Sequence, residues 1–159
     1  MDTKAFLQKA LRGEGRYCIF AANSGDKNDR VQNFYGSLDE LQQAAYELDA
    51  KGYDVYFALG VLGENDTRKV DNVKQLSSFF LDLDCGPSKD FPTQSDALDE
   101  LKAFCKTTKL PKPYLVDSGR GVHAYWFLTE PVGKEDWIPA AERLKSLCTE
   151  HGFAADPAV

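Results

Sequence analysis

The sequence predicts an α+β fold with mixed, largely antiparallel sheets and flanking helices. Its apolar and alternating runs give the order strand, helix, strand, strand, helix, strand, strand, helix, in which strands repeatedly follow one another without a helix between them. Such an order is typical of antiparallel pairing. Hydrophobic residues make up 43% of the 159 residues, with ten Phe and seven Tyr, so the chain can bury a substantial core.

The first half of the chain contains one strong helix signal between two strands. Residues 17–22 are expected to form a strand. Ser37 is a plausible N-cap, because Glu40 three residues later completes a capping box. The helix should run to about residue 51 and end at Gly52. Residues 55–62 alternate and are expected to form a single strand, which a polar loop over 63–72 follows.

The second half of the chain also alternates strands and helices, and the boundaries between them are clearer. An apolar strand is expected over 76–83, with Phe80, Leu81 and Leu83 as core residues, and a helix over 95–107. Two short strands, 114–116 and 122–128, should pair through a glycine-rich turn, and Glu130-Pro131 should end the second of them. The last helix is expected over 134–151, with a further short strand after it.

The length favours one domain over residues 1–159, or two packed halves at about 1–75 and 76–159. The four cysteines show no Cys-x-x-Cys spacing and the chain has two histidines, so a structural zinc site has little support. Reduced cysteines, no apolar run long enough to span a membrane and no signal-peptide pattern together predict a cytoplasmic protein.

The net charge of −6 is unusual for a protein whose main task is to grip duplex DNA by its phosphates. It does not exclude nucleic acid, because the local distribution of charge matters more than the sum. The segment 101–112 contains four lysines and no acidic residue. It is interpreted either as the solubilising face of a helix or as a contact for a template strand.

Asp82 and Asp84 follow the apolar run Phe79-Phe80-Leu81. Alternate side chains of a strand share a face, so both carboxylates should project together from the end of this strand. Two carboxylates so close repel one another unless a positive charge lies between them. Mg²⁺ prefers oxygen ligands and commonly takes one or two carboxylates plus substrate phosphates. A solvated turn is the plainer alternative.

A second segment, Ser118-Gly119-Arg120-Gly121-Val122-His123, places a flexible turn before a strand. It is a plausible cradle for a phosphate chain. Arg120 is either a phosphate ligand or a turn residue, and Ser118 either binds phosphate or caps the turn. His123 is either a phosphate contact or a half-buried strand histidine bonded to backbone.

The order of these two segments resembles the archaeo-eukaryotic primase superfamily, and most closely its phage and plasmid primase-polymerases. By this resemblance Asp82 and Asp84 match the metal-binding aspartate pair, and His123 matches the histidine that contacts the phosphates of the incoming nucleotide. Asp156, after the last expected helix, matches the third metal-binding aspartate; the alternative is a turn before Pro157. The resemblance also implies an RNA-recognition-like catalytic half beside an N-terminal α/β unit.

The activity that the resemblance implies is template-dependent nucleotidyl transfer by a DNA primase or polymerase. Asp82, Asp84 and Asp156 would be catalytic and would hold Mg²⁺ or Mn²⁺ as two divalent ions. His123, Ser118, Gly119, Arg120 and Gly121 would bind the nucleotide, partly through backbone N–H groups.

The expected partners are a single-stranded DNA template, dNTP or NTP substrates and a helicase module in the same or another chain, with no membrane. The host would be a bacterial or archaeal cell, and the gene that of a phage or plasmid. The chain stops three residues after Asp156, so it is expected to be a fragment of a longer replication protein. Two alternatives remain, a non-catalytic replication-initiation module that binds DNA and a metal-dependent nuclease or phosphodiesterase.

Overall fold

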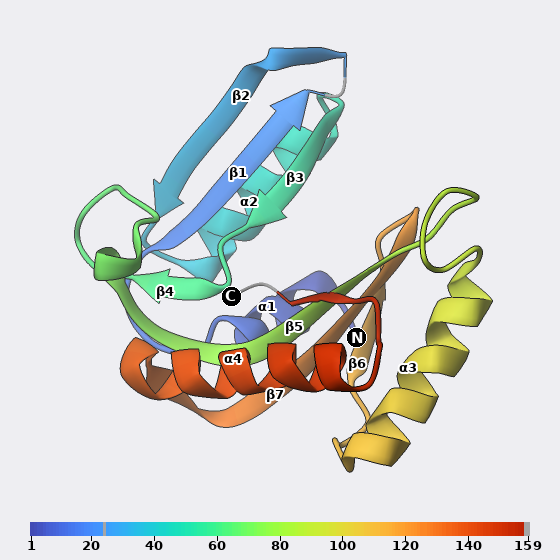
Figure 1. Cartoon of the computed structure of the whole chain (residues 1–159). Coiled ribbons are helices and arrows are strands. Elements are labelled where there is room, and N and C mark those ends of the chain that lie inside the picture. The colour runs from blue at the N-terminus through green and yellow to red at the C-terminus, as the bar shows by residue number, and fades with distance from the viewer. Residues whose placement is uncertain (24, 158–159) are drawn as a thin grey trace. The chain divides into compact units, whose positions relative to one another are not determined.

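The computed structural model describes residues 1–23 and 25–157 and shows an α+β fold, as predicted (Figure 1). Within these residues four α-helices accompany two antiparallel sheets, with strand orders β2-β1-β3 and β4-β5-β7-β6, and with β8 added to β5. In chain order the elements are α1 Thr3–Ala10, β1 Tyr17–Asn23, β2 Asp26–Tyr35, α2 Leu38–Asp49, β3 Tyr53–Phe57, β4 Gly60–Leu62, a 3₁₀ turn Val70–Asn72, β5 Val73–Asp84, α3 Gln94–Thr108, β6 Tyr114–Asp117, β7 Gly121–Gly133, α4 Lys134–Glu150 and β8 Asp156–Pro157.

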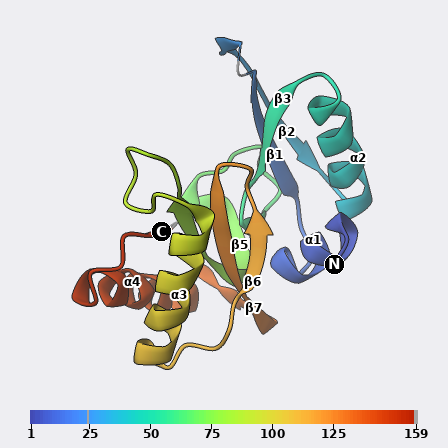
Figure 2. The same ribbon diagram turned by 90° about the vertical axis from the view of Figure 1, so that its right-hand side faces the viewer.

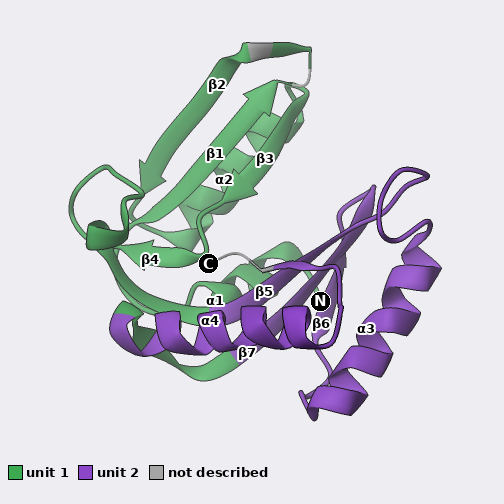
Figure 3. Cartoon of the chain, viewed as in Figure 1, with its two compact units in different colours: residues 1–77, 128–134 green, residues 78–127, 135–159 purple. Residues whose placement is uncertain are grey.

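The chain forms two compact units (Figure 3). Unit 1 contains residues 1–77 and 128–134, and unit 2 contains residues 78–127 and the described chain from 135 onward. The long strands β5 and β7 each contribute residues to both units. In the described part of the chain no helix is long and apolar enough to cross a membrane.

Unit 1 is built on the three-stranded sheet, with β1 in the centre. The predicted capping box is confirmed: Ser37 Oγ accepts from the N–H of Glu40, and the Glu40 carboxylate accepts from the N–H of Ser37. This arrangement satisfies two backbone donors that a helix start would otherwise leave unpaired. Gly52, in the left-handed conformation at φ 84°, follows the helix as expected.

In unit 1 two elements were not predicted and one prediction is wrong. The helix α1, which Asp2 caps by accepting from the N–H of Ala5, and the strand β2 were not expected. The single strand expected over 55–62 is wrong, because it is two strands in two different sheets. β3 pairs with β1, whereas β4 pairs with β5, and the chain changes partner at residues 58–59.

Unit 2 places both of its helices on one face of its sheet (Figure 2). Alternate residues of β5 and β7 enter one buried core with α3 and α4. The core residues are Leu81, Leu83, Phe91, Ala97, Leu101, Phe104, Cys105, Val122, Ala124, Trp126, Leu144, Cys148 and Phe153. Since neighbouring strand residues point to opposite faces, the intervening residues of β5 and β7 lie on the face away from the helices.

The expectation that Phe80 belongs to this core is wrong. Phe80 alternates with Leu81 and lies on the other face, where its ring contacts His123 and Tyr125 at centroid distances of 5.0 and 4.9 Å. β7 also continues through Pro131, which was expected to end it. The residues of β7 that pair with β6 run from Val122 to Tyr125, so a residue without an N–H is tolerated on that side farther along β7.

The chain after α4 is anchored by one aromatic side chain. Gly152 turns the chain at φ 62°, and Phe153 is 6% exposed. The Phe153 ring stacks on Phe104 at a centroid distance of 4.5 Å and an interplanar angle of 17°. This contact fixes the chain three residues before Asp156, the first residue of β8.

Candidate functional site

The alternation of β5 and its pairing with β8 bring three predicted carboxylates to one face of unit 2. Asp82 and Asp84 lie two residues apart, on the face opposite Leu81 and Leu83. Asp156 stands directly across from Asp82 in the antiparallel β5–β8 pair. Directly opposed residues in such a pair have Cβ atoms about 5 Å apart on the same face. This pairing makes neighbours of Asp82 and Asp156, which lie 74 positions apart in the sequence.

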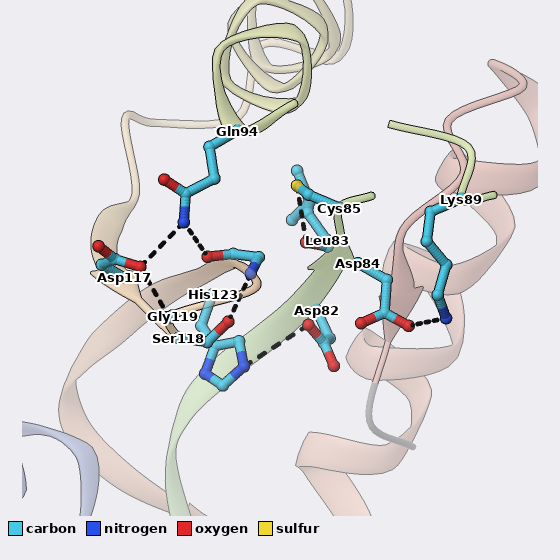
Figure 4. Close-up of polar contacts among 11 residues, drawn as sticks. Asp82, Leu83, Asp84, Cys85, Lys89, Gln94, Asp117, Ser118, Gly119 and His123 are labelled. Atoms are coloured by element: carbon cyan, nitrogen blue, oxygen red, sulfur yellow. Dashed lines mark hydrogen bonds and ion pairs between the residues drawn. The ribbon is translucent and has the colours of Figure 1, made fainter. Parts of the chain in front are cut away.

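His123 joins this face from β7. Its Nε2 lies 3.5 Å from Oδ1 of Asp82, and the two side chains are 26% and 38% exposed (Figure 4). The Phe80 and imidazole rings make a T-shaped contact with an interplanar angle of 83°. The imidazole is therefore held between an aromatic ring and a carboxylate, and the site is partly open to solvent.

Asp84 makes an ion pair with the loop that follows β5. Lys89 Nζ lies 2.8 Å from Oδ2 of Asp84 (Figure 4). The loop is closed by backbone bonds from the N–H of Gly86 to Phe91 O and from the N–H of Lys89 to Gly86 O. Lys89 was not expected at the site. It lies five residues after Asp84, and this spacing does not by itself predict an ion pair.

The electrostatics of the site centre on Asp82. Burial raises its pKa, the positive partner His123 opposes the rise, and the negative charges of Asp84 and Asp156 add to it. Burial also raises the pKa of the Tyr125 phenol, with a smaller contribution from Asp82. The hydrogen bond to Asp84 raises the pKa of the Lys89 ammonium. The site thus holds excess negative charge, which a bound cation would neutralise.

The donor chemistry of the three aspartates fits a divalent cation, which prefers carboxylate oxygens. As the side chains lie here, no group of three His, Cys, Asp or Glu residues within the described chain is gathered closely enough to hold a metal ion. Instead, the Lys89 ammonium donates a hydrogen bond to Oδ2 of Asp84. The aspartates therefore supply the right ligand type and strand register, and the assignment of Asp82, Asp84 and Asp156 as metal ligands stays a prediction.

The glycine turn before β7 is tightly hydrogen-bonded within itself. Asp117 Oδ1 accepts from the N–H of Gly119 at 2.8 Å, and Ser118 Oγ accepts from the N–H of Gly121 at 3.0 Å (Figure 4). Gln94 Nε2 donates to Asp117 Oδ1 at 2.9 Å and to Gly121 O at 3.0 Å. Ser118 thus caps the turn, which was one of its two expected roles.

These bonds change the expectation for phosphate binding. The N–H groups of Gly119 and Gly121 are engaged by Asp117 and Ser118, so in this conformation they do not point free donors at a phosphate. The exposed Arg120 and the half-buried His123 remain as candidate phosphate contacts. Gly119 adopts φ 86°, and a Cβ at Gly121 would collide with the backbone carbonyl of Leu83, so the turn requires both glycines.

Sequence reasoning missed Asp117 and Gln94, which hold this turn. Asp two residues before Gly119 is a recognisable turn signal, because aspartate commonly accepts from the N–H two positions on. Gln94 gave no such signal, since it lies 23 residues before Asp117 and reaches the turn from the first residue of α3.

One comparison links the chain to a known protein. Over 83 residues, which are 52% of this chain, it is 30% identical to a replication protein of Clostridium perfringens. The chain spans about a fifth of that relative's length. No protein-family model matches the chain. No solved structure matches it significantly either.

Proposed function

We propose that unit 2 is the catalytic core of a template-dependent nucleotidyltransferase, a DNA primase or polymerase of a replication system. The observation that carries this proposal is the placement of Asp82, Asp84 and Asp156 on one sheet face, with Asp156 paired to Asp82 and His123 beside them. The partial similarity to a replication protein supports the same reading.

In the proposed reaction the 3′-hydroxyl of a primer attacks the α-phosphorus of a nucleoside triphosphate, and pyrophosphate leaves. The hydroxyl proton passes to solvent or to a carboxylate of the site. His123 would donate a hydrogen bond to a phosphate oxygen, and Arg120 would place a guanidinium against the same triphosphate. Template pairing would select the base, so the chain needs to supply position and charge rather than a covalent nucleophile.

Asp82, Asp84 and Asp156 would hold Mg²⁺ or Mn²⁺, which when bound supplies neutralisation of the triphosphate and acidification of the attacking hydroxyl. Lys89 would have to release Asp84 for that carboxylate to act as a ligand, because its ammonium now lies 2.8 Å from Oδ2. Asp117 and Gln94 would position the turn that carries Arg120 and leads into His123.

The test is extension of a labelled primer on a single-stranded DNA template, with Mn²⁺ and either dNTPs or NTPs. Asp82→Ala and Asp84→Ala should abolish extension, and His123→Ala should raise the nucleotide concentration needed more than the template concentration. Asp54→Asn, an exposed carboxylate on β3, is the control that should leave extension unchanged. Normal extension by a folded Asp82→Ala, Asp84→Ala double variant would overturn the proposal.

A second candidate is a non-catalytic DNA-binding module for replication initiation. The absence of three gathered ligands in the described chain and the engaged N–H groups of Gly119 and Gly121 favour it. It predicts DNA binding without any synthesis and tolerance of Asp82→Ala. A nuclease or phosphodiesterase on the same carboxylates would instead form product without a nucleoside triphosphate.

A further inference from the structure

A surface groove in unit 2 lies between α3 and β6, away from the carboxylates. It encloses about 540 Å³, and we call it the α3–β6 groove. Its apolar lining includes the buried Leu101 and Cys105 and the exposed Leu98 and Leu115. Leu98 is 37% and Leu115 46% exposed, so two large aliphatic side chains stand in solvent beside a preformed hollow.

The groove has a defined backbone frame. α3 ends at Thr108, its C-cap Lys109 takes the left-handed conformation at φ 60°, and the link that follows leads directly into β6 (Figure 2). The indole N–H of Trp126 donates to Pro111 O at 2.7 Å and holds this link to β7. β6 is the last strand in its sheet. The hollow is therefore formed by anchored elements and does not depend on a loop alone.

Three lysines surround the apolar lining. Lys102 and Lys106 lie one turn apart on α3, and Lys112 lies on the link. Among the described residues that line the groove, Asp99 is the only acidic one. No acidic side chain of the described residues forms an ion pair with any of these lysines. In a chain of net charge −6 the groove is thus a local concentration of positive charge.

The residues that line the groove bear on the two interpretations of the lysine-rich segment 101–112, which were a solubilising helix face and a contact for a template strand. A merely solubilising helix face would not border a hollow lined by leucines. A track for single-stranded DNA uses successive aromatic rings for base stacking. The groove itself is aliphatic, and one ring, that of the 48% exposed Tyr114, lines the adjoining hollow with Lys112 and Pro113.

We propose that the α3–β6 groove binds an acidic, amphipathic peptide segment of a partner protein. Leucine-like side chains of the segment would cover Leu98 and Leu115, and its carboxylates would pair with Lys102, Lys106 and Lys112. Apolar anchors within a rim of complementary charge are the usual pattern of helix-in-groove recognition. This proposal stands independently of the proposed nucleotidyl transfer, because no residue of the groove belongs to that site.

The experiment is selection of a random displayed-peptide library on the whole chain, followed by affinity measurement with each selected peptide made synthetically. Peptides that bind the groove should carry net negative charge with leucine, isoleucine or phenylalanine at helical spacing. Leu98→Asp and Lys102→Glu should each weaken their binding by about tenfold or more, which corresponds to about 1.4 kcal/mol. Leu98 and Lys102 are both exposed, so these variants should fold.

Lys145→Glu is the matched control, because it makes the same charge change at an exposed position of α4 outside the groove. It should leave peptide affinity within about twofold. Amide resonances around Leu98 and Leu115 should shift on addition of the peptide. An oligo-dT of similar length serves as the competing probe and should leave those resonances unchanged.

Four outcomes would overturn the proposal. The selection could yield no peptides with acidic excess, or the selected peptides could bind Leu98→Asp as tightly as the parent chain. Alternatively, oligo-dT could bind in the groove and lose affinity with Lys102→Glu but not with Lys145→Glu, which would assign the groove to the template strand. Concentration-dependent shifts of the same resonances without peptide would assign it to a second copy of the chain.

Discussion

Replacing Asp82 by Asn should stabilise the metal-free protein and strongly reduce its stabilisation by divalent cations. Asp82 is opposed by Asp156 across β5 and β8 and shares its face with Asp84. Two unit charges about 5 Å apart repel by about 1 kcal/mol in water and about 3 kcal/mol at an effective dielectric constant of about 20. Since Asp82 is 38% exposed, solvent screening favours the lower value, about 1 kcal/mol.

For a chain of this length, about 1 kcal/mol corresponds to a rise in Tm of about 2–4 °C. A cation at about 100 times its Kd would stabilise the parent protein by about 2.7 kcal/mol, or about 5–10 °C, and Asp82→Asn should gain much less. The assay is thermal unfolding with excess chelator and across a Mn²⁺ titration.

Two results would refute this reasoning. If Mn²⁺ stabilised Asp82→Asn as much as the parent protein, the cation would bind elsewhere. If Asp82→Asn lowered the Tm of the metal-free protein, the carboxylate would be a favourable partner of His123 and not a repelled neighbour. Asp54→Asn should reproduce the parent protein under both conditions, and it controls for the loss of one negative charge.

Lys89→Met should lower the Mn²⁺ concentration at half-maximal thermal stabilisation severalfold, because it frees Asp84 from its ion pair; an unchanged midpoint would show that Lys89 does not compete for that carboxylate. Gln94→Ala removes two hydrogen bonds from the glycine turn and should speed amide exchange at Gly119 and Gly121, with a stability loss of about 1 kcal/mol; equal exchange rates would mean that Asp117 and Ser118 hold the turn alone. The N–H of Gly119 lowers the pKa of Asp117, so the contribution of this carboxylate should be complete above about pH 4 and lost as pH falls through the lower folded-state pKa. Protection of the Gly119 amide followed against pH measures this, and Asp117→Asn should remove the transition.

The features that sequence reasoning located correctly are those that local patterns specify. The capping box at Ser37 and the shared face of Asp82 and Asp84 follow from spacing alone. The strand β2 escaped because its residues are mostly polar and do not alternate; its order comes from backbone pairing with β1 along the edge of a sheet. A polar edge strand carries little of the burial signal on which periodicity depends.

The arrangement of the candidate site depends on contacts that no local pattern encodes. Asp156 could be assigned a role only by resemblance, and its position opposite Asp82 follows from a register between distant segments. The bonds of Gln94 to the glycine turn likewise join a helix start to a strand start. Phe80 was assigned to the core because an apolar run does not reveal which of its faces the helices cover.

The packing of Phe153 influences the fraction of molecules in which Asp156 lies on the same face as Asp82 and Asp84. Within the described residues, Asp156 and Pro157 of β8 pair with β5, and the buried Phe153 ring keeps Asp156 at a high local concentration near Asp82. Any ligand that requires all three aspartates would bind with an affinity scaled by the fraction of molecules in which β8 is paired with β5. Changes in the packing of Phe104 against Phe153 could therefore tune the site from within the core, without altering any residue that touches a substrate.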